Sequence, residues 1–224
     1  MNQGGDPMMP YPVAIARDSY RTATEDRGSI RFVGPQVLIA VADGVGGMAG
    51  GAAAAELAVL TVMARGPFLD PAALVTLLME ADRRIYDEPG AGETTIVVAV
   101  ASPQGIVGAS VGDSAAWLVT ADGCVDLTRN QQVAPALGSA AAAPVPFVHR
   151  RPGGTLVIGT DGLFNFVHAD RICATARGPD LDGSARSLVD LARLRTGDFQ
   201  DDITVALCRW HPASETVQDP MEAK

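Results

Sequence analysis

Four acidic clusters in this 224-residue chain each stand beside a turn at the end of a predicted strand. Carboxylates of one sign are costly to gather unless a cation neutralises them. A set of oxygen ligands selects Mg²⁺ or Mn²⁺ over zinc. The pattern therefore favours a divalent-cation site, although each cluster taken alone would also suit a solvated turn. The clusters are Glu25-Asp26, Asp43-Gly44, Asp161-Gly162 and Asp201-Asp202, and Asp113 extends the same pattern.

The stretch 36–64 holds the most distinctive of these carboxylates, Asp43. Residues 36–42 form an apolar run that is short enough for one buried strand, and five of the next nine residues are glycine. An Ala- and Leu-rich helix is predicted from about residue 52 to residue 64. A carboxylate that faces small glycines suits a hard cation or a phosphate group.

A dinucleotide-binding enzyme is a more distant alternative for the same stretch. Gly44-x-Gly46-x-x-Ala49 matches the fingerprint G-x-G-x-x-G/A between a strand and a helix. That fold also needs a second strand with an acidic end about 20 residues later. No such strand is predicted here.

The elements that must hold the acidic clusters are short strands framed by two pairs of helices. Residues 93–127 are predicted to form an antiparallel meander, and residues 128–144 a loop. The arrangement predicts an α+β fold in which two antiparallel sheets pack face to face with helices outside. Strands are predicted at 13–16, 31–33, 36–42, 94–101, 105–111, 115–120, 124–127, 145–149, 155–160 and 203–210, and helices at 52–64, 71–87, 169–176 and 183–195.

Composition excludes several classes of protein. With 47% hydrophobic residues, the chain is predicted to form one globular domain over 13–211, between an N-terminal segment (1–12) and a polar tail (212–224). A net charge of −9 argues against nucleic-acid binding. No apolar run reaches the roughly 18 residues of a membrane span. Three cysteines without a C-x-x-C pair indicate a reducing compartment, so we expect a cytoplasmic protein.

Six motifs in order give the chain a family resemblance over roughly residues 13–210. The chain resembles the metal-dependent type 2C protein serine/threonine phosphatases, in the short bacterial form that lacks most of the flap. The resemblance implies a four-layer α-β-β-α sandwich of two antiparallel sheets flanked by helices. The motifs are Arg21-x-x-x-Glu25-Asp26, Val41-Ala42-Asp43-Gly44-Val45-Gly46-Gly47, Gly92-Glu93-Thr94-Thr95, Val111-Gly112-Asp113-Ser114, Thr160-Asp161-Gly162-Leu163 and Asp201-Asp202-Ile203-Thr204.

The resemblance also implies a role for each acidic cluster around two Mn²⁺ or Mg²⁺ ions. Asp43 is expected to bridge the ions, and the water between them would attack phosphorus directly, so that no Ser or Cys nucleophile is required. The implied metal ligands are Asp43, the Gly44 carbonyl, Asp161 and Asp201; Glu25 and Asp26 would hold metal-bound waters, and Arg21 would bind the phosphoryl oxygens.

Asn165 departs from the family pattern. It lies four residues after Asp161, where the family often has an aspartate for a third ion beside Asp113. An amide adds no charge, so a third ion is expected to bind weakly. The resemblance further implies a phosphorylated protein as substrate and an opposing serine/threonine kinase. A catalytically silent, phosphoprotein-binding regulator on the same fold is the alternative.

Overall fold

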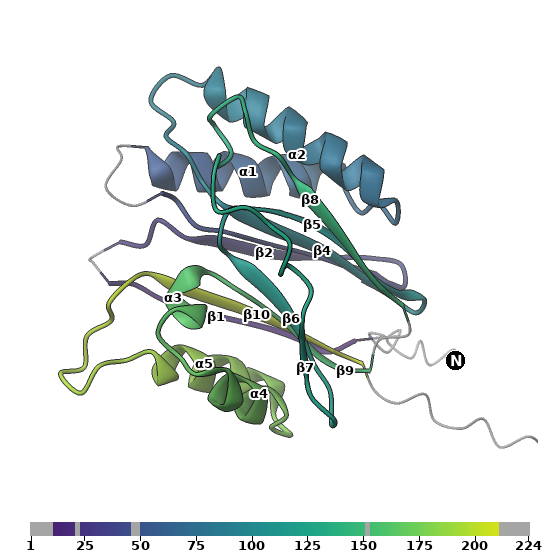
Figure 1. Cartoon of the computed structure of the whole chain (residues 1–224), viewed down its shortest axis with the longest axis vertical. Helices are drawn as coiled ribbons and strands as arrows, with labels where there is room; N and C mark the ends of the chain where they lie inside the picture. The colour runs from purple at the N-terminus through teal and green to yellow at the C-terminus, as the bar shows by residue number, and fades with distance from the viewer. Residues whose placement is uncertain (1–10, 21–22, 46–49, 151–152, 211–224) are drawn as a thin grey trace, which may run out of the picture.

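Two antiparallel sheets, each of five strands, form the centre of the computed structural model, which describes residues 11–20, 23–45, 50–150 and 153–210. Figure 1 shows the sheets stacked on one another. In spatial order, one sheet holds β1 (Val13–Asp18), β10 (Ile203–Trp210), β9 (Gly154–Gly159), β6 (Ala115–Val119) and β7 (Cys124–Asp126), and the other holds β2 (Arg27–Val33), β3 (Gln36–Ala42), β4 (Ile96–Ser102), β5 (Gly105–Val111) and β8 (Val145–Arg150).

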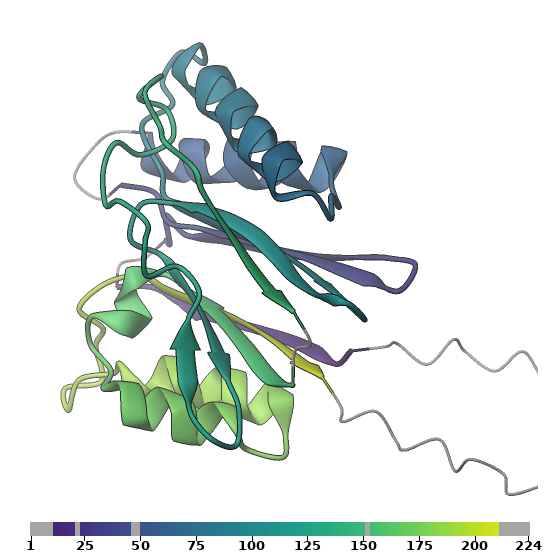
Figure 2. The same ribbon diagram turned by 45° about the vertical axis from the view of Figure 1, so that its right-hand side comes forward.

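Helices cover the outer face of each sheet, which gives the four layers α-β-β-α (Figures 1 and 2). One pair packs on the sheet that contains β3, and the other pair packs on the sheet that contains β10. The predicted α+β sandwich of two antiparallel sheets flanked by helices is therefore confirmed. The first pair is α1 (Gly51–Arg65) and α2 (Pro71–Tyr86), the second is α4 (Ala169–Ala176) and α5 (Leu181–Leu191), and the short α3 (Asp161–Phe164) follows β9.

The pattern of β3 explains why the layers form. Its even-numbered side chains pack toward α1 and α2, whereas its odd-numbered side chains pack into the core between the sheets. A strand that is covered on both faces carries a continuous apolar run rather than an alternating one. Helix α2 begins at Pro71, and the Asp70 side chain accepts a hydrogen bond from the Ala72 amide at 3.0 Å.

Two details differ from the sequence-based predictions. The expected meander over 93–127 is divided, because β4 and β5 join one sheet while β6 and β7 join the other. The residues after β9 form the short helix α3, which was not predicted. In addition, β3 and β4 are antiparallel neighbours, which excludes the parallel strand–helix–strand unit of a dinucleotide-binding fold.

Most residues of the two predicted end segments, 1–12 and 212–224, fall outside the described ranges. Residues 1–10 and 211–224 lie outside the described residues. Tyr11 is buried, and the centroid of its ring lies 5.3 Å from that of Trp210. Tyr11 is therefore part of the packed core. Within the described ranges, no helix is long and apolar enough to cross a membrane.

Candidate active site

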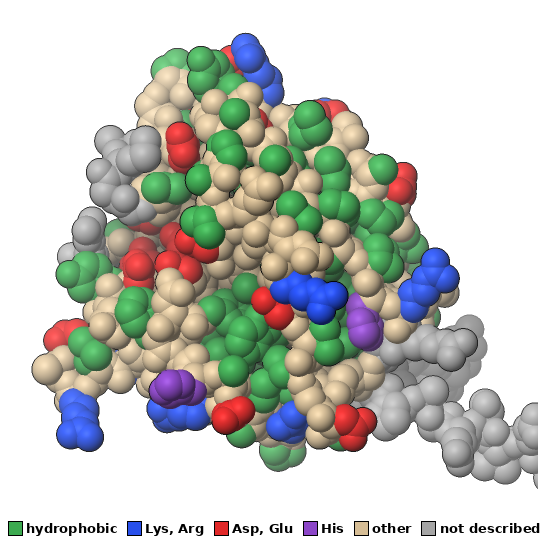
Figure 3. Space-filling model, in the orientation of Figure 1, with side chains coloured by type: hydrophobic (Ala, Val, Ile, Leu, Met, Phe, Trp, Pro, Cys, Tyr) green, Lys and Arg blue, Asp and Glu red, His purple; other side chains and the backbone are tan. Residues whose placement is uncertain are grey.

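The acidic clusters meet at one edge of the sandwich, where strands of both sheets end. A cleft of about 280 Å³ opens there. Figure 3 shows acidic side chains gathered in a hollow on this side of the molecule. Asp26 lies beneath the cleft, fully buried, whereas Arg21 lies outside the described residues. The predicted site residues that line the cleft are Glu25, Asp43, Gly44, Asp113, Asp161 and Asp201.

The backbone of Asp43 is held by the chain that leads into β4. The Thr95 amide and the Thr94 hydroxyl both donate to the Asp43 carbonyl oxygen, at 2.8 and 2.7 Å. A side chain at Gly44 would collide with the backbone of Gly51 at the start of α1. The glycine therefore allows the Asp43 loop and the helix to pack closely.

Asp26 links the two sheets beneath the cleft. The Thr160 hydroxyl donates to Asp26 Oδ2 at 2.9 Å and accepts from the Thr204 amide at 3.0 Å. Burial raises the pKa of Asp26 to about 7, and the hydrogen bond from Thr160 offsets part of this rise. An ionised Asp26 is therefore unfavourable without a nearby positive charge.

Among the clustered carboxyls, Asp43 has the most strongly raised pKa. Burial, followed by the negative charges of Asp26 and Asp161, raises the pKa of Asp43 to about 10. Burial also raises the pKa of Asp161, together with the charges of Asp113 and Asp201. The common cause is that several carboxylates share a poorly solvated space. Binding of a cation would remove this penalty.

The donor set fits hard divalent cations. Asp26 Oδ1 and Asp161 Oδ1 are buried acceptors that lack a well-formed hydrogen bond among the described residues. No group of three or more His, Cys, Asp or Glu side chains in these residues has metal-holding geometry as it stands. The carboxyls instead act on one another, since the charges of Asp26 and Asp161 both raise the pKa of Asp43. Oxygen donors of this kind suit Mg²⁺ or Mn²⁺.

Asp202 and Asn165 form hydrogen bonds with predicted site residues. Asp202 accepts hydrogen bonds from the Tyr20 amide (2.8 Å) and the Glu25 amide (2.6 Å), so it holds the turn between β1 and β2. The Asn165 side chain donates to Asp161 Oδ2 at 2.9 Å. Both Asp201 and Asp202 line the cleft, and the sequence had no signal that Asp202 also holds this turn.

Glu93 also lines the cleft, although no role was predicted for it. Its carbonyl accepts a hydrogen bond from the Val45 amide at 2.9 Å, which fixes the chain just after Asp43. The only sequence signal for Glu93 was its place in the Gly92-Glu93-Thr94-Thr95 motif. That motif therefore contributes both to the wall of the cleft and to the position of Asp43.

Solved structures of bacterial phosphatases share this fold. The alignment with Stp1, a serine/threonine phosphatase from Staphylococcus aureus, has a TM-score of 0.78 and 19% identity, and it covers 92% of this chain and 96% of that one. The S. agalactiae serine/threonine phosphatase gives 0.78 and 23%, with coverages of 90% and 100%. The catalytic domain of PstP, in complex with two manganese ions, gives 0.73 and 20%, with coverages of 89% and 97%.

At these identities the structural likeness establishes the fold, which is that of the type 2C phosphatases, as the sequence predicted. Residues 34–211 match the family model described as Stage II sporulation protein E (SpoIIE). The match covers well over half of the chain, so the chain belongs to the SpoIIE family. The motif with Arg21, Glu25 and Asp26 lies before the matched region. No curated protein sequence matches the chain.

Proposed function

We propose that this chain hydrolyses phosphoserine and phosphothreonine in proteins, with residues 13–211 as the catalytic unit and two Mn²⁺ or Mg²⁺ ions as cofactors. The observation that carries the proposal is the meeting of carboxylates from separate strand ends in one cleft, where two buried oxygens have no hydrogen-bond partner among the described residues. Membership of the SpoIIE family and the two manganese ions in the PstP complex support the same conclusion.

Four residues of the chain would hold the two ions. We assign Asp43 as the ligand shared by both ions, because the charges of both Asp26 and Asp161 act on it. The Gly44 carbonyl, Asp161 and Asp201 complete the proposed ligand set. The bound ions would acidify a water and neutralise charge on the phosphoryl group.

Three further residues would orient the reactants. We assign Glu25 and Asp26 to water molecules around the ions, and Asp26 is supported in this role by its fixed position below Asp43. Arg21 is assigned to the phosphoryl oxygens, because a planar guanidinium matches their geometry. Asp113 remains a candidate for a weak third ion, since its charge acts on Asp161.

The biological setting is part of the proposal. The substrate would be a phosphorylated protein that a serine/threonine kinase has modified, and the chain would act without nucleic acid because its net charge is −9. All three cysteines are free thiols, which supports a reducing compartment such as the cytoplasm.

Phosphate release from a phosphothreonine peptide tests the proposal directly. We expect release with added Mn²⁺ and none with EDTA. The Arg21→Ala variant should lose most of its peptide hydrolysis while it retains Mn²⁺ binding by calorimetry. A silent regulator would bind the phosphopeptide without releasing phosphate, and that result would contradict the proposed activity. Loss of metal binding in Arg21→Ala would instead assign Arg21 to the architecture of the carboxylate cluster.

A further inference from the structure

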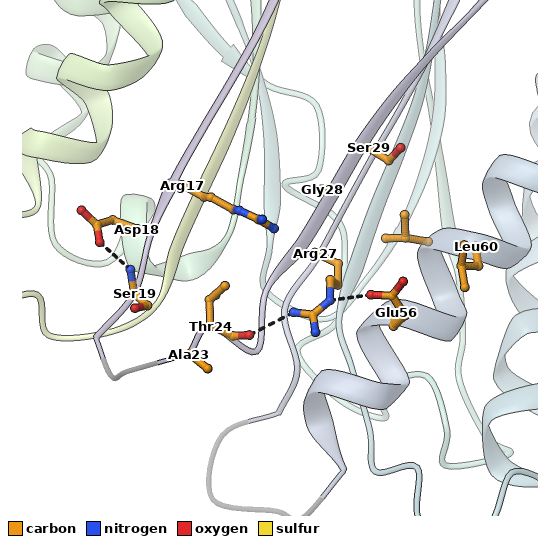
Figure 4. A pocket seen from close by; sticks show the side chains of 11 residues that line it. Arg17, Asp18, Ser19, Ala23, Thr24, Arg27, Gly28, Ser29, Glu56 and Leu60 are labelled. Atoms are coloured by element: carbon orange, nitrogen blue, oxygen red, sulfur yellow. Dashed lines mark hydrogen bonds and ion pairs between the residues drawn. The ribbon is translucent and has the colours of Figure 1, made fainter.

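A second, larger cleft of about 750 Å³ lies directly beside the candidate active site. It is lined by residues of β1, β2 and α1 and by Ser19, Ala23 and Thr24 between the two strands, and we call it the β1–β2 cleft (Figure 4). Thr24 lines this cleft, and the next residue, Glu25, lines the acidic cleft. The two clefts therefore adjoin, so a chain that extends from a phosphoryl group in the acidic cleft can run toward the β1–β2 cleft.

The edges of the two sheets form the walls of the β1–β2 cleft. Among the described strands, β1 pairs only with β10, and β2 pairs only with β3, so each is the edge strand of its sheet. The edges come together where Gly28 of β2 faces Ile15 of β1, because a side chain at Gly28 would collide with that of Ile15. Arg17 of β1 and Arg27 of β2 line the cleft near this contact, where an extended segment can enter between the two edges.

Among the described residues that line the β1–β2 cleft, one positive charge lacks a partner. Arg17 is exposed on β1, and among the described residues its guanidinium has no ion pair or hydrogen bond. Figure 4 shows the Arg17 side chain extended from β1 into the opening toward β2. Its neighbours are already compensated: Arg27 pairs with Glu56 at 2.6 Å, and Asp18 pairs with Arg193 at 3.0 Å.

The remaining surface of the β1–β2 cleft suits a peptide. Leu60 of α1 lines it and is 50% exposed, so it offers an apolar contact to a passing side chain. Hydroxyl groups of Thr24 and Ser29 also line the cleft. An unpaired guanidinium beside polar and apolar surface favours an extended segment that carries a carboxylate.

We propose that the β1–β2 cleft binds the substrate segment that flanks the phosphoresidue, and that Arg17 selects an acidic side chain in it. This inference rests on the proposed phosphatase function. Because its net charge is −9, the chain as a whole repels an acidic segment. Arg17 would supply a local attraction for such a segment. Arg17 is therefore assigned as a specificity-determining residue that takes no part in the chemical step.

A set of phosphothreonine peptides tests the role of Arg17. Each peptide carries Glu, Gln or Lys at one position, two to six residues before or after the phosphothreonine. At one or more positions, the wild-type protein should prefer Glu over Gln by about two- to fivefold in kcat/KM, mainly through KM. The ratio compares peptides within one variant, so differences in folding or metal loading cancel.

Charge reversal provides the decisive comparison. In Arg17→Glu the preference at the same position should reverse, with Lys favoured over Glu. The matched control is Arg150→Glu, because Arg150 is also an exposed arginine on an edge strand but lies at the end of β8 that points away from the site. This control should keep the wild-type preference.

The other possible results separate the role of Arg17 from the phosphatase function. A wild-type protein that hydrolyses the peptides without regard to flanking charge overturns the assignment of Arg17 but leaves the phosphatase function intact. Failure to hydrolyse any peptide with Mn²⁺ present refutes the phosphatase function itself, and the assignment falls with it. If Arg17→Glu changes the mass of the protein in solution and the preference is absent, the β1–β2 cleft is an interface between copies of the chain.

Discussion

Asp82 of α2 anchors a loop that forms one wall of the candidate active site. Its carboxylate is 6% exposed and accepts hydrogen bonds from the amides of Gly138 (2.7 Å), Ala140 (3.1 Å) and Ala142 (3.2 Å). Gly138 and Ala140 have positive φ angles, which turn successive amides toward the same carboxylate. The loop between β7 and β8 therefore wraps around one buried charge.

The anchored loop is coupled to Asp43 by a short series of contacts. Leu137 and Thr94 exchange two backbone hydrogen bonds, both of 2.9 Å, and the Thr94 hydroxyl donates to the Asp43 carbonyl oxygen. Residues of the same loop, Ala134 and Ala136 among them, line the acidic cleft. A change at Asp82 should therefore affect both stability and turnover.

The size of the effect follows from the three hydrogen bonds. A hydrogen bond to a charged group contributes about 1.5–3 kcal/mol, and an amide left without a partner adds a cost. Removing the carboxylate also removes its own desolvation penalty, which offsets part of this sum. We expect Asp82→Ala to lower the free energy of unfolding by about 3 kcal/mol, or roughly 6–12 °C in the unfolding midpoint. Asp82→Asn, which keeps one acceptor oxygen, should lose about half as much.

Urea unfolding of the metal-free protein measures the stability change, and Mn²⁺-dependent peptide hydrolysis measures the change in activity. Asp87→Ala is the matched control, because Asp87 ends the same helix but pairs with Arg83 on the surface, with its side chain 55% exposed. That exposed pair should contribute no more than about 0.5 kcal/mol. Turnover in Asp82→Ala should fall on the order of 10-fold through displacement of the loop. If Asp82→Ala is as mild as Asp87→Ala in both assays, the anchoring role is refuted.

Three further predictions concern the carboxylate cluster. Asp43→Asn should abolish turnover but stabilise the metal-free protein by about 1–3 kcal/mol at pH 8, as measured by thermal unfolding, and wild-type activity in this variant would refute the two-metal site. Because the pKa values of Asp26 and Asp43 are raised to about 7 and about 10, protons bind the folded state more tightly. The stability of the metal-free protein should therefore fall as pH rises from about 4 toward these values, and saturating Mn²⁺ should suppress the fall; a flat profile would contradict the raised pKa values. Asn165→Asp should add a weak phase to a Mn²⁺ titration, whereas Asp113→Asn should change the wild-type titration little; loss of a metal and most activity in Asp113→Asn would make Asp113 a principal ligand.

Several elements were determined by the local sequence. The bounds of β3, β5, α4 and β10 agree with those predicted, because each is a pattern of apolar residues bounded by turn-forming or polar residues. Helix α2 was found within one residue for the same reason, with Pro71 at its start. The acidic residues at strand ends were also visible, since the end of an apolar run marks the end of a strand.

The tertiary structure alone decided how these elements combine. Strands β5 and β6 are adjacent in sequence but belong to different sheets, whereas Asp18 of β1 pairs with Ile203 of β10. Local patterns show that a strand has an apolar face, but they do not show which distant edge will satisfy its hydrogen bonds. The prediction of one meander over 93–127 was wrong for this reason.

The chemistry of the site was likewise determined partly by the sequence and partly by the tertiary structure. The sequence determined which residues carry negative charge and that a hard cation would suit them. Burial of Asp26, the turn held by Asp202 and the anchoring role of Asp82 were decided only by the packed structure. A pKa depends on how completely distant parts of the chain exclude water from a carboxylate, and a hydrogen-bond partner depends on which backbone amides are brought to it. Both are properties of the tertiary arrangement, so the residue types alone could not specify them.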